Sequence, residues 1–597
     1  GELLLHYGTD EQKKRYLPRL AHGEDIPCFA LTEPTAGSDA ANGQATGVVC
    51  KGVYNGEEVL GLRLNFSKRY ITLAPVATVI GLSFRALDPD GLLGGDDGGG
   101  EDLGITCALL PRDLDGMDIG GRHDPMGIPF PNGPIFGKDA FIPMDFVIGG
   151  VGGVGQGWRM LMECLAAGRS ISLPAQSVGA VQLAARVVGA YGTVREQFGL
   201  PIGRFEGIEE PLANIAGHAY FMEAARRLTC GFVDAGEKPS VPSAIVKAYL
   251  TDGMRDCMSD ALDIRAGAGI CRGPRNILGR GYVAVPIAIT VEGANILTRS
   301  MIVYGQGAIR CHPFVQDEMA AVAEGDLARF DRALFGHANF AATNAVRSFV
   351  LGLTGGRFAR VPVSGFEAPC YRKLTRYGAA FAFLSDMALM ILGGSLKRRE
   401  KLSGRFADVL AWLYLGSATL KRFNDDGRPD EDKALLQWSL ELAFYRIEEA
   451  LAGLLDNFPN RPIAWLLRIF ILPYGRTRKM PSDALGARVA GALLEGDKRR
   501  DKLTAAIFVP DDNLPGLGML ERSLEAVVAS RPAESKIGAA VRSGVLEKAP
   551  SSTLSERAMH ANIVTSDEKN TVDAAAAARL EAVQVDWFDA ETYQTLR

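Results

Sequence analysis

The stretch Gly149-Gly-Val-Gly-Gly-Val-Gly-Gln-Gly157 marks the place where the pattern of the sequence changes. Before it, between about residues 27 and 143, apolar and polar residues alternate, most clearly in Leu-Gly-Leu-Arg-Leu-Asn-Phe from residue 60 to residue 66. A period of two is typical of half-buried strands. After it, apolar residues recur every three or four positions almost to the end of the chain, which is typical of helices. The sequence therefore predicts a β-rich part followed by a long helical part.

The same glycine-rich stretch invites comparison with the GxGxxG fingerprint of dinucleotide-binding folds. That fingerprint needs a strand before it, a helix after it, and a second parallel strand with an acidic residue about 20 positions on. Here the β-rich part ends and helices follow, and no second parallel strand is predicted. We therefore interpret residues 149–157 as a hinge between domains rather than as a nucleotide-binding loop.

A helix is predicted before the β-rich part. Thr9 and Gln12 have the spacing of a capping box, and Gly23 supplies a stop. The chain does not open with a charged segment, an apolar segment and a cleavage site, so we expect no signal peptide and interpret the first residue as lying inside a longer protein. The order of helix, strands and helices excludes a doubly wound sheet.

The composition narrows the classes of function. At roughly 150 residues per domain, the 597 residues predict about four domains. The 65 Lys and Arg residues against 70 Asp and Glu residues give a net charge of −5, which argues against nucleic-acid binding. The 9 cysteines form no CxxC pair, so neither a disulfide framework nor a zinc site is expected, and we assign no metal ligand.

Two apolar segments of the helical part bear on membrane contact. Residues 379–396 are nearly long enough to span a bilayer, which needs about 20 apolar residues, but Asp386 would be costly there, so a buried core helix is favoured. Residues 463–472, which a basic stretch follows, could lie on a membrane surface. A core helix with a basic end is the favoured interpretation of that segment too.

The segment Cys28-Phe-Ala-Leu-Thr-Glu-Pro-Thr-Ala-Gly-Ser-Asp39 could face a ligand. It predicts a short strand that ends in a turn, in which Pro34 lacks an N–H donor and Gly37 permits a positive φ. The hydroxyls of Thr32 and Ser38 would then be free to bind a ligand. On physical grounds alone, an ordinary turn at the end of a strand is the favoured interpretation.

The segment Lys68-Arg-Tyr-Ile-Thr72 is predicted to be a strand. Tyr70 and Thr72 would share one face, so the aromatic ring could lie against a flat ligand while the hydroxyl donates to its edge. An exposed sheet face would give the same pattern.

A third segment, Ile289-Thr-Val-Glu-Gly-Ala-Asn295, places Glu292 in an apolar run just before a glycine. Loss of hydration raises the pKa of a carboxyl group, which makes it a better base near neutral pH. A Glu that caps the next helix would look the same, and the residues alone favour neither interpretation.

Taken together, these segments resemble the acyl-CoA dehydrogenase family over about residues 1–315. The matching strings are FALTEPTAGSD (29–39), KRYIT (68–72), REQFG (195–199), DIRAGAG (263–269) and VEGANILTR (291–299). The chain is also similar to the large bacterial members of the FadE type. That similarity rests on GELLLHYGT (1–9), IGGVGGVGQGWRM (148–160), EGIEEPLA (206–213), PIAITVEGANILTRS (286–300), GQGAIRCHP (305–313) and the long helical region that follows.

The resemblance implies an α+β multidomain fold of the acyl-CoA dehydrogenase type, with helices, a β-barrel or sandwich domain, a helical bundle and an additional all-α C-terminal domain. The expected parts are residues 1–26, the end of an N-terminal helical domain; residues 27–150, the β-domain; residues 151–320, the helical bundle; and residues 321–597, the extra domain with a loose tail from about residue 550. The rest of the N-terminal domain, with part of the substrate pocket, is expected to lie outside this chain.

The resemblance also implies an FAD cofactor between the β-domain and the helical bundle. The residues implied in cofactor binding are Phe29, Leu31, Thr32, Gly37, Ser38, Tyr70, Ile71, Thr72, Arg195, Gln197, Phe198, Asp263, Gly267 and Asn295. Arg195, Gln197 and Phe198 would reach the cofactor of a neighbouring subunit, where Arg195 could hold a phosphate. Asp263 and Gly267 match positions that bind the adenine half across the dimer.

By the same resemblance Glu292 is the catalytic base, and Ser38, Arg169 and Gly293 contact the acyl-CoA substrate. In one subgroup the base lies just before the matching Arg, at the position of Gly168 in this chain. Glycine has no side chain that could accept a proton, so Glu292 is the matched candidate.

The implied reaction is the FAD-dependent α,β-dehydrogenation of a medium- to long-chain fatty acyl-CoA to trans-2-enoyl-CoA, the first step of β-oxidation. Electrons would pass to an electron-transfer flavoprotein. The alternatives are an acyl-CoA oxidase that uses O₂ and a catalytically inactive scaffold of the same fold. We expect a homodimer in the cytoplasm with no nucleic-acid partner, and a peripheral contact with the inner membrane is left open.

Overall fold

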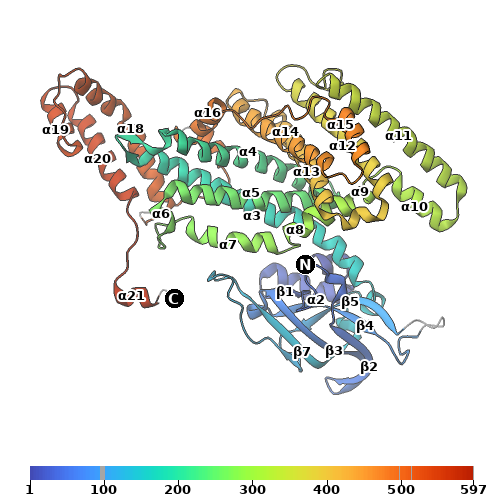
Figure 1. Cartoon of the computed structure of the whole chain (residues 1–597). Coiled ribbons are helices and arrows are strands. Elements are labelled where there is room, and N and C mark those ends of the chain that lie inside the picture. Colours follow the sequence, from blue (N-terminus) through green and yellow to red (C-terminus); the bar gives the residue numbers. More distant parts are fainter. Residues whose placement is uncertain (95–100, 497, 512–513, 596–597) are drawn as a thin grey trace. The chain divides into compact units, whose positions relative to one another are not determined.

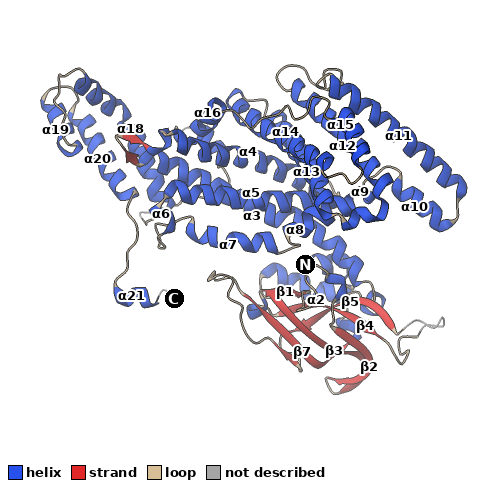
Figure 2. Cartoon of the chain, viewed as in Figure 1, coloured by secondary structure: helices blue, strands red, loops and turns tan. Residues whose placement is uncertain are grey.

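A computed structural model describes residues 1–94, 101–496, 498–511 and 514–595 of the chain (Figure 1). The chain forms two compact units: the first comprises Gly1–Arg169 and Thr290–Ala294, and the second comprises Ser170–Ile289 and Asn295–Arg597. The long strands lie in the first unit and the second unit is nearly all helical, as Figure 2 shows. This confirms the predicted change from strands to helices along the chain.

The first unit is built on a seven-stranded mixed sheet. Its elements are α1 (Glu2–Tyr7), α2 (Asp10–His22), β1 (Pro27–Ala30), β2 (Thr46–Tyr54), β3 (Glu57–Thr72), β4 (Val79–Leu87), β5 (Asp102–Pro111), β6 (Met117–Asp118) and β7 (Asn132–Pro143). The strand order is β1-β4-β2-β3-β7-β6, and β5 also pairs with β4. β1 and β2 run parallel to β4, whereas the other neighbours are antiparallel.

Helix α2 begins and ends where the sequence predicts. The Thr9 hydroxyl accepts a hydrogen bond from the backbone N–H of Gln12, and the Gln12 side chain accepts one from the N–H of Thr9, so the capping box is complete. Gly23 follows the helix with a φ of 72°. The Gln12 amide also donates to the carbonyl oxygens of Asp145 and Val147 at 2.8 and 2.7 Å. The helix is therefore fixed to the segment that follows β7.

Strand β3 contains the predicted alternation. Leu62 and Leu64 are buried on one face, while Arg63 and Asn65 are exposed on the other. The buried face packs with residues of β4 and β7 into one apolar core. β4 begins at Val79, after the segment 74–76 forms a 3-10 turn.

The glycine-rich stretch is not a hinge between the two units, so that expectation is wrong. Residues 149–157 lie inside the first unit, and the units divide at Arg169, within helix α3 (Gly157–Val194). The Gly155 N–H donates to the Thr106 hydroxyl on β5 at 2.9 Å. A Cβ atom at Gly153 would lie 1.9 Å from a carbonyl oxygen. The glycines allow the backbone to pack closely, a role that composition does not distinguish from flexibility.

The second unit consists of helices and one short hairpin. Its elements after α3 are β8 (Glu196–Gln197), β9 (Leu200–Pro201), α4 (Glu206–Asp234), α5 (Ser240–Arg265), α6 (Gly267–Ile270), α7 (Gly279–Thr290), α8 (Asn295–Leu297), the π-helix η6 (Thr298–Gln306), α9 (Gly307–Arg310), α10 (Val315–Glu324), α11 (Leu327–Leu353), α12 (Ala368–Leu392), α13 (Glu400–Asp425), α14 (Lys433–Asp456), α15 (Arg461–Ile471), α16 (Asp483–Leu494), α17 (Lys498–Leu503), α18 (Leu517–Arg542), α19 (Ser551–His560), α20 (Ser566–Ala582) and α21 (Ala590–Thr595).

Helices α13 and α14 pack directly against α4. A Cβ atom at Gly217 of α4 would lie 2.0 Å from Trp438 Cε3 of α14, so only glycine allows this approach. Arg422 of α13 donates to the carbonyl oxygen of Tyr220 at 2.7 Å, and its guanidinium lies 4.2 Å from the centre of that tyrosine ring. The helices before and after residue 320 therefore share one packed interior.

Helix α12 contains the apolar segment 379–396. By length and composition, Ala368–Arg398 is the one described helix that could cross a membrane, and a second candidate exists if Gly279–Thr290 and Asn295–Arg310, bent by 46°, count as one span. Within the protein, 44% of the apolar window of α12 is buried, and the Asp386 carboxylate is hydrogen-bonded to His312 Nε2 at 3.0 Å. A core helix with a paired acidic residue matches the favoured interpretation.

The segment after residue 550 is not a loose tail, which corrects the expectation. It contains α19 and α20, and α20 begins at a complete capping box formed by Thr565 and Glu568. Arg579 of α20 forms a two-pronged ion pair with Glu534 of α18 at 2.8 and 3.1 Å. The polar composition suggested disorder, but the capping box and the alanine-rich run from residue 574 to residue 578 favour a helix.

Candidate functional site

The turn after β1 is held by a buried ion pair. Lys68 Nζ, at the far end of β3, donates to Glu33 Oε1 at 2.7 Å and to the carbonyl oxygens of Leu31 and Ser83 at 3.0 and 2.7 Å. The Glu33 carboxylate accepts from the backbone N–H groups at the start of β2. Burial lowers the pKa of Lys68, and the neighbouring Glu33 carboxylate opposes this shift. Because the buried ammonium group bonds both Glu33 and the Leu31 carbonyl oxygen, it fixes the position of the turn.

Neither Glu33 nor Lys68 was among the residues expected at the site. Lys68 is followed by Arg69 and Glu33 lies in the turn after β1, and their separation of 35 residues hides the pairing. A charged residue at an inward-facing position of the alternating strand is the feature that could have indicated Lys68, because buried charges in proteins are generally paired.

The structure brings the two predicted segments of the β-rich part together. The Arg69 N–H donates to the Thr32 carbonyl oxygen at 3.0 Å, and the Arg69 guanidinium donates to the Pro34 carbonyl oxygen at 2.9 Å. Tyr70 and Thr72 are both exposed on one face, as predicted. Ile71 is buried in the core of the sheet, so a ligand contact at this position would come from its backbone.

The remaining residues of the first segment lie at the surface of the first unit. Phe29, Leu31 and Thr32 are half-buried, and Gly37 and Ser38 are exposed. Gly37 does not have the positive φ that we expected. No atom of the described structure lies within 4 Å of a Cβ built at Gly37, so neither backbone conformation nor packing in this unit explains the glycine.

Glu292 and Arg169, predicted to act on one substrate, both belong to the first unit. Arg169 is half-buried, and its Nε atom has no hydrogen-bond partner among the described residues. Burial lowers the pKa of Arg169, and the nearby Glu292 carboxylate opposes that shift. Glu292 itself is exposed, so the expected burial of its carboxyl group within an apolar run is not found in this unit.

Asn295, which the resemblance assigns to the cofactor, makes several hydrogen bonds to helix α5. Its side chain is buried, and its amide oxygen accepts from Lys247 Nζ at 2.8 Å. Its amide nitrogen donates to Thr251 Oγ1 and to Asp252 Oδ1, both at 2.9 Å. These bonds fix the start of α8 to α5. A polar residue after a turn gives the same sequence pattern whether it binds a ligand or a neighbouring helix.

In the second unit, the segments REQFG and DIRAGAG meet at Tyr191 of α3. The Arg195 guanidinium lies 5.9 Å from the centre of the Tyr191 ring and donates to its hydroxyl at 3.3 Å, while the Arg265 guanidinium lies 5.2 Å from the same ring. Arg265 is buried, burial lowers its pKa, and its Nε and Nη1 atoms have no partner within the described chain. Two unsatisfied buried N–H donors beside Arg195 suit an anionic group such as a phosphate.

The other predicted residues of the second unit are exposed. Gln197 donates to the Glu196 carbonyl oxygen at 2.6 Å, and Phe198, at the tip of the β8–β9 hairpin, is 96% exposed. Asp263 lies in the last turn of α5, and Gly267 begins α6. Arg265, between them, was missed because an arginine at a helix end ordinarily needs no further explanation.

Four of these segments share an uncommon backbone feature. Tyr70, Phe198, Ala266 and Glu292 have positive φ angles of 60°, 53°, 48° and 56°, although none is glycine. Such conformations cost on the order of 1–3 kcal/mol each and persist only where the surroundings enforce them. They are concentrated at ligand-binding and catalytic sites, so the strain supports a functional role for these four segments.

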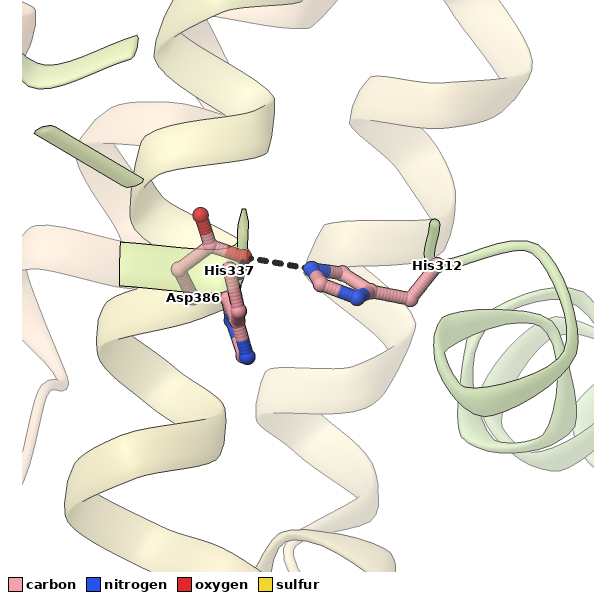
Figure 3. A group of neighbouring side chains, drawn as sticks. All are labelled: His312, His337 and Asp386. Carbon is pink, nitrogen blue, oxygen red and sulfur yellow. Dashed lines mark hydrogen bonds and ion pairs between the residues drawn. The ribbon is translucent and has the colours of Figure 1, made fainter. Parts of the chain in front are cut away.

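A histidine cluster in the C-terminal block was not foreseen (Figure 3). His312 Nε2 lies 3.0 Å and His337 Nε2 lies 3.7 Å from Asp386 Oδ1. The backbone N–H groups of Phe314 and Val315 donate to His312 Nδ1, both at 3.2 Å. The proton of a neutral His312 therefore sits on Nε2 and points to Asp386, which leaves that nitrogen without a lone pair for a metal. We interpret the cluster as a hydrogen-bonded junction that joins α11 and α12.

Comparisons with known proteins identify the family and the fold. Three family models match: "Acyl-CoA dehydrogenase, middle domain" at residues 28–140, "Acyl-CoA dehydrogenase, C-terminal domain" at residues 155–305, and "Acyl-CoA dehydrogenase, C-terminal, bacterial type" at residues 309–588. A crystal structure of an acyl-CoA dehydrogenase complexed with FAD from Bacillus anthracis aligns with a TM-score of 0.64 at 20% identity, over 83% of this chain and 80% of that one. This likeness confirms the expected fold, including the additional helical domain.

Two curated relatives match this chain over different lengths and at different identities. Protein HemX of Proteus mirabilis is 54% identical over 103 residues, which are 17% of this chain and 58% of that protein. The probable acyl-CoA dehydrogenase FadE10 of Mycobacterium tuberculosis is 26% identical over 452 residues, which are 73% of this chain and 65% of that protein. The chain thus spans about six tenths of the length of each. From the middle domain to the bacterial-type C-terminal domain, the family models follow one another along this sequence, and the chain belongs to the acyl-CoA dehydrogenase family.

Proposed function

We propose that this chain carries the active site of an FAD-dependent dehydrogenase that converts medium- to long-chain fatty acyl-CoA to trans-2-enoyl-CoA, the first step of β-oxidation. The observation that carries the proposal is that Glu292 lies within electrostatic reach of Arg169 and is held in a strained backbone conformation. Family membership and the relatives named as acyl-CoA dehydrogenases support it.

The residues present suit an FAD molecule. The turn after β1, which the Lys68–Glu33 pair fixes, would hold the flavin with the Thr32 and Ser38 hydroxyls, and the exposed Tyr70 ring would lie against a flat ligand. The unsatisfied donors of Arg265, beside Arg195, would hold a phosphate of the cofactor of a neighbouring subunit in a homodimer. Bound FAD supplies the acceptor for the hydride that leaves the β-carbon.

The residues of this chain would handle the proton. The Glu292 carboxylate accepts the α-proton of the thioester, and the positive charge of Arg169 favours the ionised form of the carboxylate before the transfer. Gly293, with a φ of 91°, presents backbone that a thioester can approach closely, and the N–H of Glu292 can donate to the thioester oxygen as negative charge develops there. The proton thus leaves carbon for the Glu292 carboxylate, and the double bond forms between the α- and β-carbons.

The electron acceptor and the location extend the proposal. Electrons would pass to an electron-transfer flavoprotein. An oxidase would instead release hydrogen peroxide in proportion to substrate, and an inactive scaffold would not react with acyl-CoA at all.

We propose a cytoplasmic protein that touches the inner membrane through α15, whose Trp465, Leu466 and Ile469 form an exposed apolar face. Sedimentation with anionic vesicles, lost on Trp465→Ser, tests the contact.

Glu292→Gln tests the central assignment. The variant should retain FAD, seen in its visible absorption spectrum, because the amide preserves the shape of the side chain. It should lose at least a thousandfold in the rate at which an acyl-CoA of medium or long chain bleaches the flavin, because an amide cannot accept the α-proton. Glu58→Gln, on the exposed start of β3, is the matched control and should bleach at the unmodified rate. Bleaching of Glu292→Gln at an undiminished rate would refute the assignment.

A further inference from the structure

A cavity of about 650 Å³ lies within the second unit, and none of the residues assigned above to cofactor or substrate lines it. Its walls come from α4 and α5 on one side and from α13 and α14 on the other. We call it the junction cavity. Its volume is in the range of small-molecule sites, which is about 300–1,000 Å³. The space is too small for a folded partner, so its occupant would be a small molecule.

The junction cavity carries an excess of negative charge. Five carboxylates and three guanidinium groups line it. Arg299 forms a two-pronged ion pair with Asp408 at 2.7 and 2.5 Å, and Arg446 donates to Glu449 at 3.0 Å. These contacts neutralise two of the carboxylates. Arg255, which does not line the cavity, also acts on Asp252 and Asp256. The lining itself still holds two more carboxylates than guanidinium groups, so it suits a ligand with more than one positive charge.

Those three carboxylates form a row along α5. Asp252, Asp256 and Asp260 are four residues apart, which at a rise of about 1.5 Å per residue places them roughly 6 Å apart along one face of the helix. Asn295 donates to Asp252 at 2.9 Å and Asn214 donates to Asp260 at 2.5 Å. Asp256, in the middle, has no hydrogen bond or ion pair with any residue that the structure describes. Asp256 is exposed, so its carboxylate is free to pair with a ligand that enters the cavity.

Burial raises the pKa of all three aspartates, and the Asp252 charge raises that of Asp256 further. Asp252 and Asp256 are exposed and Asp260 is half-buried, so their carboxylates lose only part of their hydration, but like charges one helical turn apart repel each other. A cation placed between them would remove both costs.

His218 points to the same chemistry independently of the aspartates. It lines the cavity, it is 8% exposed, and burial lowers its pKa to about 4, so its ring is neutral near pH 7. Its Nδ1–H donates to the Asn214 carbonyl oxygen at 2.8 Å, which leaves the Nε2 lone pair as an acceptor without a donor among the described residues. A ligand that donates N–H bonds would satisfy it.

Aromatic rings complete the wall. The rings of His218 and Phe221 have centres 4.8 Å apart, and those of Phe221 and Trp412 have centres 5.7 Å apart. Such a surface packs against methylene groups and attracts organic cations. A single metal ion fits less well, because carboxylates one helical turn apart cannot all approach one ion to the 2.0–2.6 Å that coordination requires.

We propose that the junction cavity binds a linear aliphatic polyamine, whose ammonium groups pair with Asp252, Asp256 and Asp260 and whose methylene chain lies against Phe221 and Trp412. A spacer of three or four methylene groups separates neighbouring ammonium groups by about one helical turn, so the repeat of the ligand matches the repeat of the helix. One ammonium group also donates to His218. This inference does not depend on the proposed reaction.

Isothermal titration of spermidine into the full chain, at constant ionic strength, tests the proposal. We expect saturable binding at one site, and at least tenfold weaker binding for Asp256→Asn and for His218→Phe. Asp331→Asn is the matched control, because Asp331 is exposed on α11 and has no hydrogen bond or ion pair with any described residue. It should bind like the unmodified chain. Butylamine, with one ammonium group, should bind at least tenfold more weakly than spermidine.

A second measurement distinguishes a variant that has lost the binding site from one that has failed to fold. Spermidine should raise the midpoint of thermal unfolding of the unmodified chain and of Asp331→Asn, but not that of Asp256→Asn, because only binding to the folded state stabilises it. The proposal is overturned if spermidine gives no saturable heat, if Asp256→Asn and Asp331→Asn bind it equally, or if Mg²⁺ at the same charge concentration displaces it.

Discussion

His218 is a residue whose protonation should govern stability in mild acid. Burial lowers its pKa in the folded protein from 6.5 to about 4, so the unfolded chain binds the proton more readily between these values. The folded state is then fully stable above pH 6.5 and loses stability as the pH falls from 6.5 to 4, by about 3 kcal/mol for a shift of this size. Urea unfolding at several pH values should show that His218→Phe lacks this loss, relative to the unmodified chain. Parallel pH profiles for the two proteins would contradict the assignment of this loss of stability to His218.

Single residues also mark the limit of what the sequence predicts. Glu292 and Arg169 could be named from motifs because their neighbours along the chain are distinctive. Glu33 and Arg265 could not, because their importance arises from contacts with residues far away in the sequence. The hydrogen bonds of Asn295 could not be predicted for the same reason: their donors and acceptors lie on α5, more than 40 residues earlier.

Among the elements, the contact between α4 and α14 makes a sharp prediction. Gly217→Ala would place a methyl group 2.0 Å from a ring atom of Trp438, so the helices must separate. We expect a loss of about 1–3 kcal/mol in the free energy of unfolding. Gly231→Ala, on the same helix with no atom within 4 Å of the new Cβ, should instead gain up to about 1 kcal/mol through helix propensity. Denaturant unfolding measures both, and equal effects would contradict the packing argument.

The sequence predicted those elements whose local pattern agrees with their packing. In α2 the capping box and the terminal glycine lie within the helix itself, and in β3 the alternation reports the buried face directly. The element predictions that rested on residue composition, rather than on the periodicity of apolar residues or on capping motifs, were wrong. The glycine-rich stretch is a close-packed turn rather than a hinge, and the polar segment after residue 550 forms α19 and α20 because helix propensity and capping outweigh its low hydrophobicity.

In the second unit as a whole, the last helices contact two segments near the residues proposed to hold the cofactor. Arg579 of α20 forms an ion pair with Glu196 of the β8–β9 hairpin at 3.1 Å. Arg275 forms one with Glu581 at 2.6 Å, and its backbone N–H donates to Asp586 at 2.8 Å. The end of the chain thus supports both the hairpin and the loop after α6, although several hundred residues separate them in sequence.

Arg579→Ala should therefore loosen the hairpin. We expect amide hydrogen exchange of residues 195–201 to become several-fold faster, because the hairpin loses its contact with α20. FAD retention should fall as well if the hairpin holds the cofactor. Arg557→Ala, which removes an exposed ion pair of α19, is the control and should leave that exchange unchanged. Equal exchange in both variants would show that α20 does not support the hairpin.

The strained backbone at Tyr70, Phe198, Ala266 and Glu292 has a consequence for anyone who evolves this protein toward heat resistance. Glycine at any of the four would relieve the local penalty, so selection for survival of heating alone would tend to accept it. The resulting proteins would endure higher temperatures and turn over substrate more slowly. A screen for heat resistance alone would therefore identify, one substitution at a time, the positions at which backbone strain serves activity.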